Sequence, residues 1–145
     1  MTLQEQLAFL QEHRTISLCT LDKDGYPHVV AMNYLAQHDR IYMATYRKSQ
    51  KVVNIRRNPK VALFLESGGF SRPRGLMIRG VCEIVEEPSE VLRIISALVQ
   101  LEGDGLPPLS SQIEKARPDK RVVLKVKPHN FVSWDFRKLD KPVTQ

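Results

Sequence analysis

The sequence predicts an α+β fold that is mainly β, an antiparallel barrel of six or seven strands with Greek-key-like connections and short peripheral helices. Most apolar segments alternate with a period of two and are separated by turn residues, which is the pattern of antiparallel strands. Shorter segments with apolar residues at helical spacing lie between these strands. That arrangement favours an α+β barrel over a parallel α/β sheet.

Length and composition are those of one domain. The chain has 145 residues, of which 42% are hydrophobic, enough for one packed core over residues 1–145. The first residues lack a basic segment followed by an apolar run, and no stretch approaches the roughly 20 apolar residues of a membrane span. We therefore expect a cytoplasmic protein with no membrane contact. The net charge of +6 favours an anionic partner, which could be nucleic acid, an acidic membrane or a phosphorylated small molecule.

The first third of the chain predicts one helix and three strands. Thr2 and Glu5 form a capping-box pattern, so a short amphipathic helix is expected to end near Arg14. Period-two alternation follows, with turns at residues 22–25 and 37–40. The expected strands are 15–21, 28–36 and 41–45. Three successive antiparallel strands predict a meander.

The remaining segments complete the barrel. A helix capped by Ser49 is expected to end before Pro59, because proline disfavours a helical residue before it. Gly80 predicts a bulge or bend inside a long strand. The expected strands are 61–66, 75–86, 121–127 and 130–136; the other expected elements are a loop at 67–73, an apolar helix opened by Pro88, a loop at 103–108 and a short helix at 111–116.

Cysteines and histidines do not suggest a metal site. Cys19 and Cys82 lie in alternating apolar segments without nearby partners, so both are interpreted as reduced core residues. The four histidines have no ligand-like spacing. They are His13, His28, His38 and His129. We predict no bound metal.

The densest polar segment runs from Thr45 to Lys51, where a strand passes into a helix within one turn of chain. Unpaired backbone N–H groups and the helix dipole favour negative charge at such a junction. Hydroxyls at Thr45 and Ser49 add donors, and Lys51 lies in the first helical turn. The segment fits a phosphate monoester; the alternative is a solvated basic face with a capped helix.

Three ordered motifs resemble a known family. Residues 49–62, SQKVVNIRRNPKVA, resemble the S-x-K-x-x-N/Q-I/L-x-x-N/D-P-x-V/A-S/A signature of the pyridoxamine-phosphate-oxidase-like, FMN-binding split-barrel superfamily. Residues 24–28, DGYPH, resemble the turn before the cofactor-bearing strand of that family. Residues 80–83, GVCE, resemble its G-x-A-E segment, and residues 122–128 with Trp134 match in character. Three motifs in order are more specific than one.

This resemblance implies a split barrel that binds FMN, or in some branches the deazaflavin F420, at a homodimer interface. It implies an FMN- or F420-dependent oxidoreductase of a small-molecule substrate. Backbone groups of Val30, Ala31, Met32 and Asn33 are expected to hold the flavin ring, and Ala44 and Thr45 to lie beside the phosphate tail. Ser49, Gln50 and Lys51 match the phosphate-binding positions. Trp134 either stacks near the ring or anchors the core or interface. No side chain is predicted to be catalytic.

Departures from pyridoxamine-phosphate oxidase itself argue against vitamin B6 oxidation. Val30 and Leu35 stand where that enzyme has an arginine and a substrate-binding lysine, and Gly75 replaces a cofactor-contacting glutamine. The C-terminal Arg-x-His segment that holds pyridoxal phosphate is also missing. A general flavin- or F420-dependent reductase is therefore the preferred interpretation.

Three alternatives remain open. A non-catalytic flavin carrier or sensor has the same sequence features, because the cofactor supplies the redox chemistry. A haem carrier would use His28 or His129 as an axial ligand. Nucleic-acid binding is less favoured, because no recognised motif or interleaved aromatic residues accompany the cations. Those cations are Arg47, Lys48, Lys51, Arg56, Arg57 and Lys60.

Overall fold

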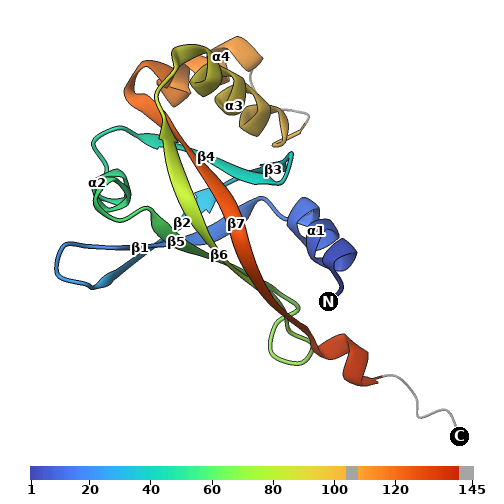
Figure 1. Ribbon diagram of the computed structural model, residues 1–145. Helices are drawn as coiled ribbons and strands as arrows, with labels where there is room; N and C mark the ends of the chain where they lie inside the picture. The colour runs from blue at the N-terminus through green and yellow to red at the C-terminus, as the bar shows by residue number, and fades with distance from the viewer. Residues whose placement is uncertain (104–107, 141–145) are drawn as a thin grey trace, which may run out of the picture.

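Seven antiparallel strands form one curled sheet, a half-barrel, in the computed structural model, which describes residues 1–103 and 108–140 (Figure 1). The order across the sheet is β2-β1-β5-β6-β7-β4-β3. The strands are β1 (Thr15–Leu21), β2 (Pro27–Asn33), β3 (Leu35–Gln37), β4 (Arg40–Tyr46), β5 (Lys60–Ser67), β6 (Arg74–Val85) and β7 (Arg121–Asp135). The predicted mainly-β, α+β class is confirmed.

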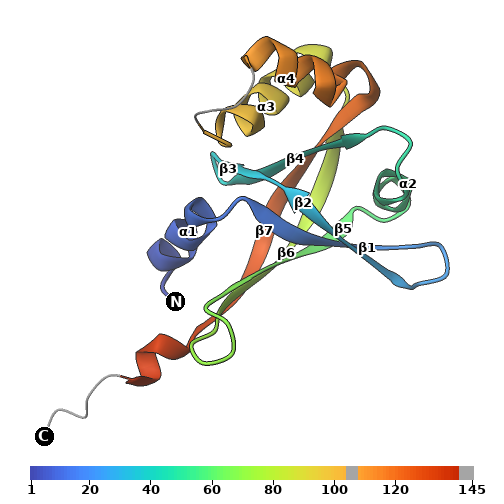
Figure 2. The same ribbon diagram turned by 180° about the vertical axis from the view of Figure 1, so that it is seen from behind.

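Short helices lie around the sheet. They are α1 (Leu3–Glu12), α2 (Gln50–Arg57), α3 (Pro88–Gln100) and α4 (Leu109–Ala116), with the 3-10 helices η1 (Pro118–Lys120) and η2 (Phe136–Asp140). Helices α3 and α4 lie together at one end of the sheet, and the end of β7 with η2 extends at the other (Figures 1 and 2). Among the described helices, none is long and apolar enough to cross a membrane.

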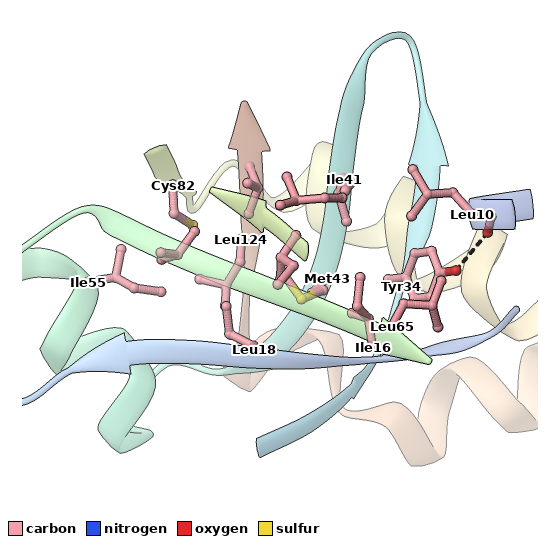
Figure 3. Packing of buried hydrophobic residues seen from close by; sticks show 14 of the residues in the cluster. Leu10, Ile16, Leu18, Tyr34, Ile41, Met43, Ile55, Leu65, Cys82 and Leu124 are labelled. Carbon is pink, nitrogen blue, oxygen red and sulfur yellow. Dashed lines mark hydrogen bonds between the residues drawn. The ribbon is translucent and has the colours of Figure 1, made fainter. Parts of the chain in front are cut away.

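The main core fills the concave side of the sheet. Alternate residues of β1 and β5 point inward, and Leu18 and Leu63 are fully buried there. Residues from α1, α2 and β4 close the cluster (Figure 3). A second cluster joins α3 to the other side of β4 and β7 through Ile94, Tyr42 and Val123. Because β4 is covered on both faces, three consecutive residues in it are buried.

The predicted meander is wrong, because the segment 28–36 is two strands. Tyr34 separates β2 from β3, and these strands form opposite edges of the sheet. The Tyr34 side chain is buried, and its hydroxyl donates a 2.6 Å hydrogen bond to the Leu10 carbonyl (Figure 3). The Tyr34 backbone N–H donates to the Arg14 carbonyl. Burial of this ring and its attachment to α1 end the β2 pairing.

The two predicted closing strands are one continuous strand, β7, which pairs with β6 along its length. The predicted irregularity at Gly80 is confirmed as a register shift between Arg79 and Gly80. Pro128 interrupts the alternation in sequence but pairs opposite Gly80, where the bulge accommodates it. The predicted loop 103–108 falls largely on residues 104–107, which lie outside the described residues.

The convex side of β1, β2, β5, β6 and the end of β7 is called the outer face here. Residues directly opposite each other in the ladder share a face, and Phe64 lies opposite both Ser17 and Met77, which in turn lies opposite Val132. The apolar residues of this face include Cys19, Leu21, Val29, Ala31, Ala62, Phe64, Met77, Val81, Val132 and Trp134. Cys82 lies in the core as predicted, but Cys19 is only half-buried because it faces outward.

A buried hydrogen-bond chain attaches α2 to β1. Asn54 is 0% exposed; its amide accepts a 2.7 Å hydrogen bond from Gln50 Nε2 and donates a 3.0 Å bond to Thr20 Oγ1. Buried polar groups cost free energy unless they are paired. This chain therefore fixes the rotation of α2, which decides the direction of its first turn.

Asn54→Leu should lower the free energy of unfolding by about 1–3 kcal/mol, because the buried Thr20 hydroxyl loses its partner. The double variant Thr20→Val/Asn54→Leu removes both polar groups and should recover most of that loss. Urea unfolding measures both. Equal losses in the single and double variants would contradict a stabilising role for this hydrogen bond.

Candidate functional site

A cavity of about 600 Å³ lies between the open edge of β2, the end of β4 and the first turn of α2. Helices α3 and α4 form its roof. The lining residues are Ala31, Met32, Asn33, Ala44, Thr45, Tyr46, Lys51, Ile95, Leu98, Val99, Glu102, Gln112, Lys115, Ala116 and Arg121. Six of the ten predicted site residues are among them: Ala31, Met32, Asn33, Ala44, Thr45 and Lys51.

One end of the cavity is cationic. Lys51 comes from the first turn of α2 and Arg121 from the start of β7. Lys115, in the last turn of α4, also lines the cavity. Burial, and next the nearby charge of Arg121, lower the pKa of Lys51. Like charges brought together in a partly buried space repel each other, so a bound anion would stabilise this end.

Arg121 is held by two contacts at the cavity wall. Its guanidinium lies 4.2 Å from the centroid of the Tyr46 ring, and its Nε donates a hydrogen bond to the Ala116 carbonyl. Tyr46 and Arg121 are also paired in the β4–β7 ladder. The strand pairing and the cation–π contact together direct a cation to the place where α2 begins.

Contrary to the prediction, the side chain of Ser49 does not cap α2. Ser49 occupies the N-cap position, but its side chain makes no capping hydrogen bond. Its Oγ lies 3.5 Å from Oγ1 of Thr45, which is 3% exposed. The Val52 N–H donates to the Ser49 carbonyl. Since no side chain caps the first turn, the N–H groups of Gln50 and Lys51 remain able to bind a ligand.

The opposite wall is the edge of the sheet. β2 pairs only with β1, so half of its backbone N–H and C=O groups point away from the ladder. Ala31, Met32 and Asn33 bring this edge to the cavity. Between the edge and the cationic end, the roof residues Ile95, Leu98 and Val99 provide an apolar surface.

Four predicted site residues do not line the cavity. Val30 packs against the main core, and the Ser49 hydroxyl lies beside that of Thr45. The Gln50 amide is bonded to Asn54. Trp134 lies on the outer face, where it stacks on Phe64 at 5.9 Å between ring centroids, far along β7 from Arg121. Its ring covers Gly75, where an added Cβ would lie 2.0 Å from the ring.

Sequence reasoning missed Arg121, Lys115 and the α3–α4 roof. Arg121 reaches the cavity through pairing between β4 and β7, which are distant in sequence. Lys115 lies in the last turn of a short helix that carried no family motif. The apolar face of α3 was recognised from the sequence. That face was the available signal for the roof, because it packs on β4.

Other residues considered from the sequence lie elsewhere. His28 and His129 do not line the cavity, although His28 Nδ1 is buried without a hydrogen-bond partner in the described part of the chain. Leu35 packs against the α3 cluster. Within residues 1–103 and 108–140, no group of three or more His, Cys, Asp or Glu residues is arranged to hold a metal ion.

Comparison with known proteins gives consistent matches. The family model described as pyridoxamine 5'-phosphate oxidase matches residues 2–135. A conserved hypothetical protein from Mycobacterium tuberculosis is 34% identical, with a TM-score of 0.87, covering 100% of this chain and 91% of that chain. An F420 reductase is 27% identical, with a TM-score of 0.60, covering 82% and 89% respectively.

An FAD-binding protein from Mesorhizobium loti shows a similar fold at 18% identity, with a TM-score of 0.70 and coverage of 92% of this chain and 94% of that chain. Comparison with the sequences of curated proteins gives no match. The matched relatives thus share the fold over nearly the full described length.

Arg121→Gln should raise the pKa of Lys51 toward the ordinary value for lysine, because a neighbouring positive charge is removed. The measurement is an NMR titration of the Lys51 side chain. Arg57→Gln, at the exposed end of the same helix, is the control and should leave that pKa unchanged. An unchanged Lys51 pKa in Arg121→Gln would show that the two cations do not interact.

Proposed function

The chain belongs to the pyridoxamine 5'-phosphate oxidase family, and from this premise we propose that it binds FMN in the cavity between β2 and β4. We propose further that it is an oxidoreductase acting on a small molecule. The observation that carries the proposal is that one cavity combines a cationic end, at the first turn of α2, with the open edge of β2. Its volume of about 600 Å³ lies within the usual range for ligand pockets, roughly 300–1,000 Å³.

The cationic end fits the phosphate of FMN. Lys51 and Arg121 supply charge-assisted donors, Thr45 supplies a hydroxyl, and the first turn of α2 supplies backbone N–H groups. Burial, and next the charge of Arg121, lower the pKa of Lys51, and a phosphate there would offset both effects. Riboflavin lacks this phosphate and would not benefit from the same contacts.

The rest of the cavity fits a flat ring. Backbone groups at the edge of β2 would bind its polar margin, and the roof would cover an apolar face and exclude water. When bound, the flavin supplies electron transfer, while the protein supplies binding, orientation and polarity. The residues of this chain that would orient the ring are Ala31, Met32 and Asn33 on one side and Leu98 and Val99 on the other.

F420 is the second candidate cofactor. The observation that favours it is Lys115, a third cation in the cavity lining, since one phosphate monoester does not require three positive side chains. The 27% identical relative is named an F420 reductase. Absorbance spectra of the protein titrated with each cofactor distinguish the two, because their chromophores absorb at different wavelengths.

We propose that the protein is a homodimer that pairs through the outer face. Val29 is 60% exposed there, Val132 43% and Phe64 37%, and large exposed apolar patches mark interaction surfaces. The open edge of β2 adjoins this face, so a second copy would also complete the wall of the cavity. In this arrangement Trp134 belongs to the interface, which was one of its two predicted roles.

The site offers no basis for vitamin B6 oxidation. Val30 and Leu35, at the positions of the missing arginine and lysine, are apolar and pack away from the cavity. A second phosphate held beside the flavin would need paired donors, without which burial of its charge costs several kcal/mol. A reductase of a different small molecule is therefore the proposed activity.

Lys51→Ala should weaken FMN binding by about 1.5–3 kcal/mol, roughly ten- to a hundredfold, and leave riboflavin binding nearly unchanged. Fluorescence titration measures both ligands. Lys48→Ala is the matched control, since Lys48 is exposed and does not line the cavity. Equal losses for FMN and riboflavin would mean that Lys51 acts through the fold.

Light scattering should give twice the chain mass of 16.6 kDa. Val29→Glu places a charge on the outer face and should produce monomers, whereas Leu92→Glu, on the exposed side of α3, should not. A wild-type monomer with full flavin affinity would contradict both the dimer and the shared cavity wall.

A further inference from the structure

A second hollow adjoins the proposed cofactor cavity across β2. It has a volume of about 270 Å³ and includes Arg14, Phe64 and Glu66 in its lining. It lies on the outer face, where the second copy of the proposed homodimer would form its remaining wall. Ala31 lines both the hollow and the main cavity. A narrow space of about 20 Å³, bordered by Arg14, Asn33 and Glu102, lies beside them. Arg14 therefore stands where the outer hollow meets the main cavity.

The backbone around Arg14 is firmly held. Its carbonyl accepts a 3.2 Å hydrogen bond from the Tyr34 N–H, and the Tyr34 hydroxyl binds the Leu10 carbonyl. The end of α1 is thus attached to the junction between β2 and β3. Because this attachment is buried, Arg14 has a defined position at the margin of the cavity.

The guanidinium of Arg14 has donors to spare. Its Nη1 donates to the carbonyls of Gln11 and His13, at 3.1 and 3.2 Å. In the described part of the chain, no carboxylate forms an ion pair with it, and neither Nε nor Nη2 makes a hydrogen bond. Burial raises the pKa of Tyr34 to about 12, so the neighbouring phenol stays neutral and does not compensate the charge.

The surroundings limit the ligand. The nearby titratable side chains are Glu66 and His13 in the outer hollow and Glu102 beside the narrow space. Two carboxylates in the linings disfavour a ligand with several negative charges. Ala31 and Phe64 give the hollow apolar walls suited to a planar body, and a guanidinium with free N–H groups matches one carboxylate.

We propose that Arg14 forms a substrate subsite next to the cofactor cavity, and that the subsite takes small planar molecules carrying one carboxylate. The assignment of this molecule as substrate rests on the proposed function, because a molecule bound beside the main cavity can react only if a cofactor occupies that cavity. The binding of a carboxylate at Arg14 does not depend on the cofactor.

Benzoate is the probe, with benzyl alcohol as its neutral counterpart. Protein-observed NMR titrations of the cofactor-free chain should show benzoate shifting resonances of Ala31, Phe64 and Arg14. Arg14→Gln should lower the affinity for benzoate at least tenfold. Arg14→Lys should retain part of that affinity because the charge remains. Benzyl alcohol should bind Arg14→Gln and wild type equally. Arg57 is an exposed arginine elsewhere, so Arg57→Gln should change the affinity for neither ligand.

The same titration on FMN-loaded protein separates this inference from the proposed function. Benzoate should perturb the flavin absorbance spectrum in wild type but not in Arg14→Gln. If FMN does not bind while benzoate binding depends on Arg14, the subsite stands and the cofactor proposal fails. If FMN binds but Arg14→Gln leaves benzoate binding unchanged, the subsite proposal is wrong. It is also wrong if FMN binds but benzoate does not bind the wild type.

Discussion

The buried attachment of Tyr34 to α1 is the constraint on which the cavity depends. Its hydroxyl bonds the Leu10 carbonyl and its N–H bonds the Arg14 carbonyl, so the chain leaves β2 before it can continue as one long strand. β2 and β3 therefore become the two edges of the sheet. The open edge of β2 faces the end of β4, and the proposed cofactor lies in the space that results. A straight strand over 28–36 would have removed this space.

At the cationic end, the fold holds Lys51 and Arg121 close together although their positive charges repel each other. Lys51 and Arg121 come from different elements, and burial, followed by the charge of Arg121, lowers the pKa of Lys51. The surrounding structure supplies the free energy that keeps them together: the buried Asn54 chain fixes α2, and the Tyr46 ring with the β4–β7 ladder fixes Arg121. Such an arrangement is stabilised when an anion binds, which is expected of a binding site and not of a solvated surface.

Local patterns predicted much of the fold, and the family resemblance pointed to the β2 residues that line the cavity. Alternation located the strands, Pro59 and Pro88 located helix boundaries, and Gly80 marked the bulge. The break at Tyr34 was missed because strand-like residues continue on both sides of it and only the burial of the ring separates them. Arg121 was missed because its position depends on pairing between strands about 75 residues apart, for which local periodicity carries no signal.

A crystal structure of the protein with FMN bound tests the central claim most directly. The account predicts the phosphate within hydrogen-bonding distance of Lys51 and Arg121 at the first turn of α2, with the ring lying along the edge of β2 beneath α3. A flavin bound elsewhere, or bound in this cavity with its phosphate away from both cations, would contradict it.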